Sequence, residues 1–321
     1  MKKAILTFAL CLSASAFAQV LDVASIEKLA TPQGVVAGIS PQGDYVLVTN
    51  ATNDGLSKYD MKTGATTVVT DARGAGRDVK IAADGQSVVY RELTFKNHLR
   101  YTEVKQANLA TGEKKQLVKP SRNIEGVAID NSAAVVVNKG KASAKALGAT
   151  KAKAAAPVLS IKNRQLMITE NGKTRTFSPN GQQFSYIWPS LSPDGNKVLY
   201  YVCGRGAYVA DLKGHIIAEL GQIRAPKWYN DEIVVGMNDK DNGEVVTSSS
   251  IVAATLYGVR QTLTDNSVIA MYPYTNGEKI AFSTANGEAY VININLKKLL
   301  RHEERIFICS SGSTCSRRNE R

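Results

Sequence analysis

Short apolar runs joined by polar turns recur along the chain and predict β-strands arranged in hairpins. The clearest copy has an apolar run ending at Leu191, the turn Ser-Pro-Asp-Gly at 192–195, and a second run at 198–200. Runs this short fit strands better than helices. Ser, Pro, Asp and Gly each favour the backbone geometry of a tight turn. The pattern therefore predicts an all-β chain.

The turn returns at a nearly regular interval. Aligned on its last position, its copies fall at residues 43, 85, 133, 195, 232 and 277. A period of this length built from short strands is typical of a β-propeller. A second set of turns, each ending in Gly, lies out of phase with the first and gives each unit four strands. We therefore predict a six-bladed β-propeller of four-stranded blades.

Two departures from the period bear on this prediction. The interval from 133 to 195 is long and contains the Ala/Lys-rich segment 138–157. Its small residues offer no apolar face, so we interpret it as a loop insert. The last unit lacks a fourth strand after Ile294, while the segment 26–31 resembles the strands that end other units. We expect this N-terminal strand to complete the last blade and close the ring.

Residues 1–18 have the features of a secretory signal peptide. Lys2 and Lys3 precede an apolar stretch, and Ala-Phe-Ala at 16–18 predicts cleavage before Gln19. The apolar stretch is too short to span a bilayer. We expect a periplasmic or secreted monomer that does not span the membrane, with the propeller at 19–295 and a flexible basic tail at 296–321.

The formal net charge of +12 changes this picture in two places. The segment from Lys139 to Lys153 holds five Lys and no acid, and the tail holds seven Lys or Arg against three Glu. Both segments are basic enough to bind an anionic polymer, although solvated, flexible segments are the plainer interpretation. No nucleic-acid partner is expected.

Residues suited to catalysis or metal binding are few. His98, His215 and His302 are far apart in the sequence, and no C-x-x-C pair suggests zinc. No G-x-S-x-G nucleophile elbow occurs. We predict no catalytic residue, no cofactor and no metal site. Cys309 and Cys315 in the tail are the candidates for a local disulfide, and the sequence does not decide whether they form it.

Aromatic residues lie just before the repeated turn, where the inner strands of a propeller reach one mouth of the channel. Trp and Tyr are enriched at binding hot spots. Packing between blades is the alternative role for such large rings. The candidate partner-binding residues are Trp188, Trp228, Tyr229, Tyr272 and Tyr274.

Residues 192–200, followed by 207–214, resemble the WD40-like β-propeller repeat of the TolB type. The resemblance covers about residues 25–295 and is clear in the first, second, fourth and sixth units. It implies a six-bladed propeller in the bacterial periplasm that binds other envelope proteins. TolB carries a separate N-terminal α/β domain without a counterpart here, so a role in the Tol system does not follow.

These features favour an exported, non-catalytic scaffold that binds a protein, or failing that a glycan, of the cell envelope. The alternative is an enzyme, a hydrolase or lyase acting on a sugar or peptide through channel-lining carboxylates. Several acids converging in the channel would favour that alternative. Binding of anionic polymers by the basic segments is a third hypothesis and predicts steep salt dependence.

Overall fold

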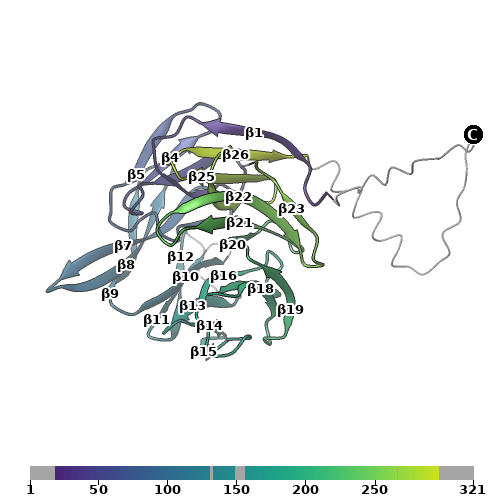
Figure 1. Cartoon of the computed structure of the whole chain (residues 1–321). Helices are drawn as coiled ribbons and strands as arrows, with labels where there is room; N and C mark the ends of the chain where they lie inside the picture. The colour runs from purple at the N-terminus through teal and green to yellow at the C-terminus, as the bar shows by residue number, and fades with distance from the viewer. Residues whose placement is uncertain (1–18, 131–132, 149–155, 266, 296–321) are drawn as a thin grey trace, which may run out of the picture.

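The computed structural model describes residues 19–130, 133–148, 156–265 and 267–295 (Figure 1). These residues form twenty-six β-strands in seven sheets. The predicted signal peptide at 1–18 and basic tail at 296–321, with Cys309, Cys315 and His302, lie outside the described residues. No helix long and apolar enough to cross a membrane occurs in the described part of the chain.

Each sheet is one blade, and its strands pair antiparallel, in chain order from the innermost outwards in every blade except the last. Blade 1 contains β2 (Val35–Ile39), β3 (Tyr45–Thr49), β4 (Leu56–Asp60) and β5 (Thr66–Thr70). Blade 2 contains β6 (Lys80–Ile81), β7 (Ser87–Lys96), β8 (Leu99–Asn108) and β9 (Lys114–Ser121). Blade 3 contains β10 (Ile124–Asp130), β11 (Ala133–Asn138) and β12 (Lys141–Ala146). Blade 4 contains β13 (Val158–Lys162), β14 (Gln165–Glu170) and β15 (Lys173–Thr176).

The remaining three blades have four strands each. Blade 5 contains β16 (Tyr186–Leu191), β17 (Lys197–Val202), β18 (Gly206–Asp211) and β19 (Ile216–Gly221). Blade 6 contains β20 (Arg224–Trp228), β21 (Ile233–Asp241), β22 (Val246–Thr255) and β23 (Arg260–Thr262). Blade 7 contains β24 (Ala270–Thr275), β25 (Lys279–Thr284), β26 (Ala289–Ile294) and, from the other end of the chain, β1 (Val23–Leu29).

The all-β propeller is confirmed, but the prediction of six blades, which the TolB-type resemblance also implied, is wrong. The long interval between the turns at 133 and 195 contains a whole additional blade, blade 4. Its inner hairpin turns at Asn163 and Arg164, with φ of 49° and 65°. This turn has no Ser, Pro or Gly, so the repeat pattern did not register it.

The expected loop insert at 138–157 is partly a strand. It includes β12, which pairs with β11 from Ala133↔Ala146 to Asn138↔Lys141 and is the outer strand of blade 3. Blades 3 and 4 have three strands each among the described residues, so the prediction of four strands holds for the other five blades. Two short blades fill the interval that one blade and an insert were expected to occupy.

Hydrophobic clusters between neighbouring blades support the same count. In β17, the alternate residues Leu199 and Tyr201 pack toward blade 6, whereas Val198, Tyr200 and Val202 pack toward blade 4. Both faces of a middle strand are thus buried, which explains why the sequence shows continuous apolar runs there. The described residues form seven such clusters, one at each boundary between blades.

The expected closure of the ring by the N-terminal strand is confirmed. Strand β1 pairs antiparallel with β26, in register from Ser25↔Asn293 to Leu29↔Ala289. In Figure 1 these two strands, from opposite ends of the chain, lie side by side. The preceding residues Val20 and Leu21 are buried between blades 6 and 7. Pairing of the two chain ends covers a sheet edge that would otherwise be open.

One hairpin extends beyond the body of the ring. Strands β7 and β8 pair over ten residues each, and Figure 1 shows them projecting past neighbouring blades. Strand β7 begins beside the repeated turn at 85 and runs away from it. The hairpin tip at Asn97 therefore lies at the far end of the molecule from the repeated turns, roughly 30 Å along the strand.

Candidate binding site at the channel mouth

The innermost strands β2, β6, β10, β13, β16, β20 and β24 contact one another around the central channel. A cavity of about 480 Å³ opens where these strands lead into the repeated turns. Strands β2, β6, β10, β20 and β24 supply most of its walls. Its apolar lining includes Ile39, Ile81 and Ile129, its aromatic lining is Trp228, Tyr229 and Tyr274, and Lys80 is its charged side chain.

Three inner strands share an unusual backbone feature beside this cavity. Trp188, Ala225 and Tyr272 each precede a proline and have φ of 52°, 46° and 53°. The pairing register of β16, β20 and β24 shifts at these positions, as expected of β-bulges. Proline has no N–H, so each bulge leaves one donor fewer to be paired. Bulges re-aim the side chains that follow, and here those residues are Ser190, Lys227 and Tyr274.

The structure brings three of the five candidate aromatic residues to the cavity. Trp228, Tyr229 and Tyr274 line it. Trp188 instead packs edge-on against the Tyr201 ring, with centroids 5.5 Å apart, between blades 5 and 6. Tyr272 is 38% exposed and does not line the cavity. Trp228 and Tyr229 also belong to clusters between blades, so binding and packing are not exclusive roles for these rings.

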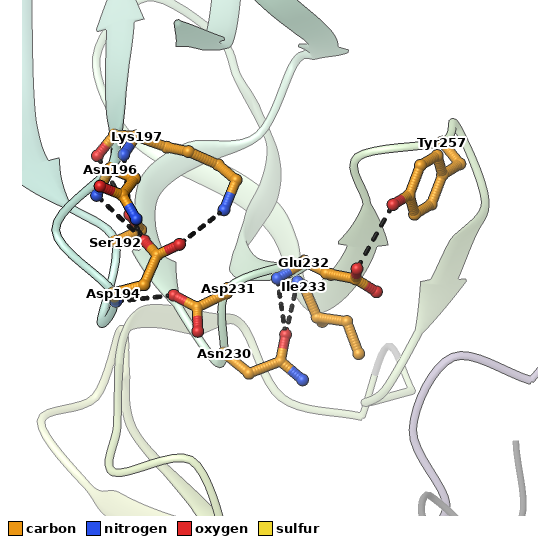
Figure 2. A network of polar contacts seen from close by, with 9 residues as sticks. All are labelled: Ser192, Asp194, Asn196, Lys197, Asn230, Asp231, Glu232, Ile233 and Tyr257. Carbon is orange, nitrogen blue, oxygen red and sulfur yellow. Dashed lines mark hydrogen bonds and ion pairs between the residues drawn. The ribbon is translucent and has the colours of Figure 1, made fainter. Parts of the chain in front are cut away.

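Side chains of the repeated turns hold the backbone at the cavity rim. Figure 2 shows the turn of blade 5, where the Ser192 hydroxyl donates to the Asp194 carboxylate and accepts from the N–H of Lys197 at 2.9 Å. Burial tends to raise the pKa of Asp194, but hydrogen bonds from Ser192 and Asn196 hold it well below its ordinary value. The Ser and Asp residues of this turn thus act as turn-forming groups, as the sequence indicated.

Neighbouring turns are also joined to one another across blade boundaries. The N–H of Asp194 donates to Oδ1 of Asp231, in the next turn, at 2.8 Å (Figure 2). Between blades 7 and 1, Nζ of Lys279 donates to the carbonyl of Gly43 at 3.0 Å. Between blades 1 and 2, the Tyr45 hydroxyl donates to the carbonyl of Gly85 at 2.8 Å. These contacts join the rim turns at three of the seven blade boundaries.

Charged groups from blades 2 and 6 meet next to Tyr274 of blade 7, in the channel beside the cavity. Nζ of Lys80 lies 2.5 Å from Asp78, and Nη2 of Arg91 lies 3.3 Å from the same carboxylate. Nζ of Lys227 lies 4.7 Å from the centroid of the Tyr274 ring. Asp78 and Lys80 act electrostatically on Lys227 although blades 2 and 6 are not neighbours. The interaction therefore runs across the channel.

The surroundings of this cluster shift the pKa values of its members. Burial, with a smaller contribution from Lys80, lowers the pKa of Lys227 to about 8. Burial, with a smaller contribution from Asp78, raises the pKa of Tyr274 to about 12. Burial opposes ionisation of Asp78, but Lys80 and Arg91 outweigh it and keep its pKa below the ordinary value. Lys227 is half-buried yet enclosed, because it faces the channel and not the outer surface.

The sequence did not single out Asp78, Lys80 or Lys227. A signal was present: Lys227 follows an X-Pro pair that recurs at 188–189 and 272–273 in the adjacent blades. Asp78 has φ of 55°, a strained value for a residue with a side chain, which only the structure reveals.

The two described histidines lie away from the channel. Nδ1 of His215 is 2.8 Å from Asp211 in an outer turn, and His98 is at the tip of the projecting hairpin. No group of three or more His, Cys, Asp or Glu side chains able to hold a metal occurs among the described residues. The expected absence of a metal site stays a prediction.

Comparison with known proteins identifies the fold. No family model matches the chain, and no curated protein does. A chain of the mitotic checkpoint complex is 10% identical with a TM-score of 0.57, covering 91% of this chain and 100% of that one. The β-propeller domain of Myceliophteria thermophila Cps50 (Swd1) is 9% identical with a TM-score of 0.55, covering 86% and 100%. An oligogalacturonate lyase in complex with manganese is 14% identical with a TM-score of 0.47, covering 83% and 78%. The similarities to the first two structures, both with TM-scores above 0.5, show a WD40-like β-propeller fold.

Proposed function

We propose that this chain is an exported, non-catalytic binding protein of the bacterial cell envelope, and that a segment of a partner protein enters the cavity at its channel mouth. The observation that carries the proposal is the cavity of about 480 Å³ with three aromatic side chains in its wall. Its volume lies in the usual range of ligand pockets. Aromatic rings in a concave, largely apolar wall are the residues that most often dominate binding energy.

The rim supports this proposal because it is preorganised. Hydrogen bonds join its turns between blades 5 and 6, 7 and 1, and 1 and 2. A rim that is already ordered loses little conformational entropy when a ligand binds. Export and an envelope location rest on the signal-peptide features of residues 1–18 and on the TolB-type resemblance of the repeats.

Site-specific photocrosslinking tests the proposal. A benzoyl-phenylalanine would replace Pro193, which lines the cavity mouth from the turn of blade 5. Two matched positions serve as controls: Ala110, exposed in an outer turn of blade 2, and Asn97, exposed at the hairpin tip. We expect adducts with one envelope protein from Pro193 and none from Ala110 or Asn97. Adducts only from Asn97, or from no position, would contradict the proposal.

The enzyme alternative has one specific observation in its favour, the meeting of Asp78, Lys80 and Lys227 in the channel. Asp78 is the carboxylate among the described residues that acts on both Lys227 and Tyr274, and two cations already pair with it. Hydrolysis of glycosides by the common mechanism uses two carboxylates. Turnover of a sugar or peptide that Asp78→Asn abolishes would establish this alternative over the binding proposal.

Binding of anionic polymers by the basic segments stays a separate prediction. Lys139, Lys141 and Lys145 lie in the β11–β12 hairpin, whereas the other two lysines of the segment, Lys151 and Lys153, and the tail lie outside the described residues. Such binding should weaken steeply as salt rises, because it depends on exposed charges. Ligand entry at the apolar cavity should respond to salt much less.

A further inference from the structure

Lys227 is a channel cation without an acidic partner. Among the described residues, no carboxylate lies within 4.0 Å of its Nζ, and the Tyr274 ring is its close contact. The other channel lysine differs, since Lys80 is paired with Asp78 at 2.5 Å. Asp78 acts on Lys227 only from beyond ion-pair distance, so a ligand carboxylate in direct contact would supply the close counter-charge that this enclosed ammonium group lacks.

The charges around Lys227 also favour an anion. Lys80, Lys227 and Arg91 contribute three positive charges against one negative charge from Asp78, which leaves the cluster with an excess of two. The enclosed channel strengthens the field of these charges relative to bulk water. Tyr274 adds no negative charge near neutral pH, since burial and Asp78 raise its pKa to about 12.

The apolar part of the cavity narrows the ligand chemistry further. Ile39, Ile81 and Ile129 line the wall beside Tyr274, and that same ring lies next to Lys227. A ligand that fills this space therefore contacts apolar and aromatic surface, and Lys227, which does not line the cavity itself, lies beside it next to the Tyr274 ring. A carboxylate carried on an apolar or aromatic group matches both parts.

We propose that Lys227 and Lys80 form a carboxylate-binding site next to the cavity, which anchors an acidic side chain or C-terminal carboxylate adjoining an apolar residue of the bound segment. The identity of the ligand as a protein segment rests on the function proposed above. The carboxylate site itself can be measured with a small molecule.

Binding of phenylacetate to the whole mature chain tests the site. Phenylacetate carries the proposed carboxylate on an aromatic ring, phenethylamine carries the opposite charge on a similar frame, and inorganic phosphate carries negative charge without an apolar group. We expect titration calorimetry or ligand-observed NMR to show binding of phenylacetate only. Equal binding of phosphate would show a general anion site and contradict the proposed need for an apolar group on the ligand. Binding of phenethylamine would contradict the proposed preference for a negatively charged ligand.

Two lysine variants make the test specific. Lys227→Met removes the charge and should weaken phenylacetate binding about tenfold or more, as expected for loss of a charged partner. Lys58→Met is the matched control, because Nζ of Lys58 lies 4.9 Å from the Tyr45 ring in a similar cation–ring contact and Lys58 does not line the cavity. Equal affinity of wild type and Lys227→Met would contradict the proposal.

The pH dependence gives a second readout that does not require removal of the side chain. The anion needs a protonated Lys227, so affinity should fall as pH rises through about 8. The groups facing Lys227 are Lys80, Asp78 and Tyr274. The lowered pKa of Asp78 and the raised pKa of Tyr274 keep both of these groups from changing charge near that pH. Lys227→Arg, which stays charged, should bind phenylacetate with no loss near pH 8. An unchanged fall in the Arg variant would assign the titration to another group and overturn the role of Lys227.

The outcomes separate this proposal from the proposed function. Binding of phenylacetate without crosslinking from Pro193 would support the carboxylate site and contradict the proposed protein partner. The opposite result would be equal crosslinking from Pro193 in wild type and in Lys227→Met, together with no binding of phenylacetate. It would support the protein partner and contradict the carboxylate site.

Discussion

Gln261 and Leu21 are 240 residues apart in sequence and hold each other by two hydrogen bonds. The N–H of Leu21 donates to Oε1 of Gln261 at 2.8 Å, and Nε2 of Gln261 donates to the carbonyl of Leu21 at 3.0 Å. The same Oε1 accepts from the N–H of Val20 at 2.7 Å. Gln261 lies on β23, the outer strand of blade 6, so this amide fixes the N-terminal segment just before it enters blade 7.

Replacement of Gln261 should therefore weaken the closed ring. Gln261→Leu keeps the size of the side chain but removes three hydrogen bonds, and we expect the free energy of unfolding to fall by about 2–4 kcal/mol. Urea unfolding followed by tryptophan fluorescence measures this change. Gln261→Glu is the control, because it keeps the acceptor and should lose less. Equal stability of Gln261→Leu and wild type would show that the amide does not secure the closure.

A close backbone approach predicts the effect of one glycine. A Cβ on Gly236 of β21 would lie 2.3 Å from Cγ2 of Ile223 and 2.9 Å from the carbonyl of Arg224 on the neighbouring inner strand. Gly236→Ala should therefore destabilise the chain by about 1–3 kcal/mol, as overpacking does. Gly148→Ala, where no atom lies within 4 Å of the added methyl, should change stability little. Thermal melts of the two variants make the comparison, and similar melting temperatures would contradict it.

The contact between two turns at the rim also has a measurable consequence. The side chain of Asp231 accepts from the N–H of Asp194 across the boundary of blades 5 and 6. Asp231→Ala should lower stability by about 1 kcal/mol, whereas Asp231→Asn keeps the acceptor and should lose less. Chemical denaturation distinguishes the two. If both variants unfold at the same urea concentration, the contact does not join the blades in solution.

Acid should remove part of the stability through Asp211. Hydrogen bonds from the backbone and side chain of His215 lower the pKa of Asp211 to about 2, from an ordinary 3.8. A carboxylate with a lowered pKa stabilises the fold above its unfolded-state pKa and loses that contribution as pH falls toward the folded value. Asp211→Asn should thus show a smaller loss of urea resistance between pH 3.8 and about 2 than wild type. Identical losses would show that the lowered pKa makes no contribution.

The sequence predicted those parts of the fold that local turn chemistry controls. The Ser-Pro-Asp-Gly turn at 192–195 follows from residue types that favour turn geometry. The pairing of β1 with β26 could be predicted because the last unit lacks a fourth strand and the segment 26–31 resembles the strands that end other units. Blade 4 was missed because its inner turn uses Asn163 and Arg164, whose left-handed conformations are fixed by the hairpin and have no matching signature in the sequence.

The site was predictable only in part for a similar reason. Trp228, Tyr229 and Tyr274 were found because large aromatic rings stand out next to a repeated turn. Asp78, Lys80 and Lys227 were not, since lysine and aspartate are mostly surface residues and their meeting depends on blades 2 and 6 facing each other across the channel. Such a contact between distant blades is set by ring closure, not by any local pattern.

The most direct test of the central claim, that the ligand enters at the channel mouth, is hydrogen–deuterium exchange of the chain with and without the envelope protein captured from Pro193. The account predicts slower exchange at the rim turns, residues 39–43, 79–85, 228–231 and 274–277. The hairpin tip at 93–102, at the far end of β7, should exchange equally in both states. Protection confined to that tip, with the rim turns unchanged, would contradict the account.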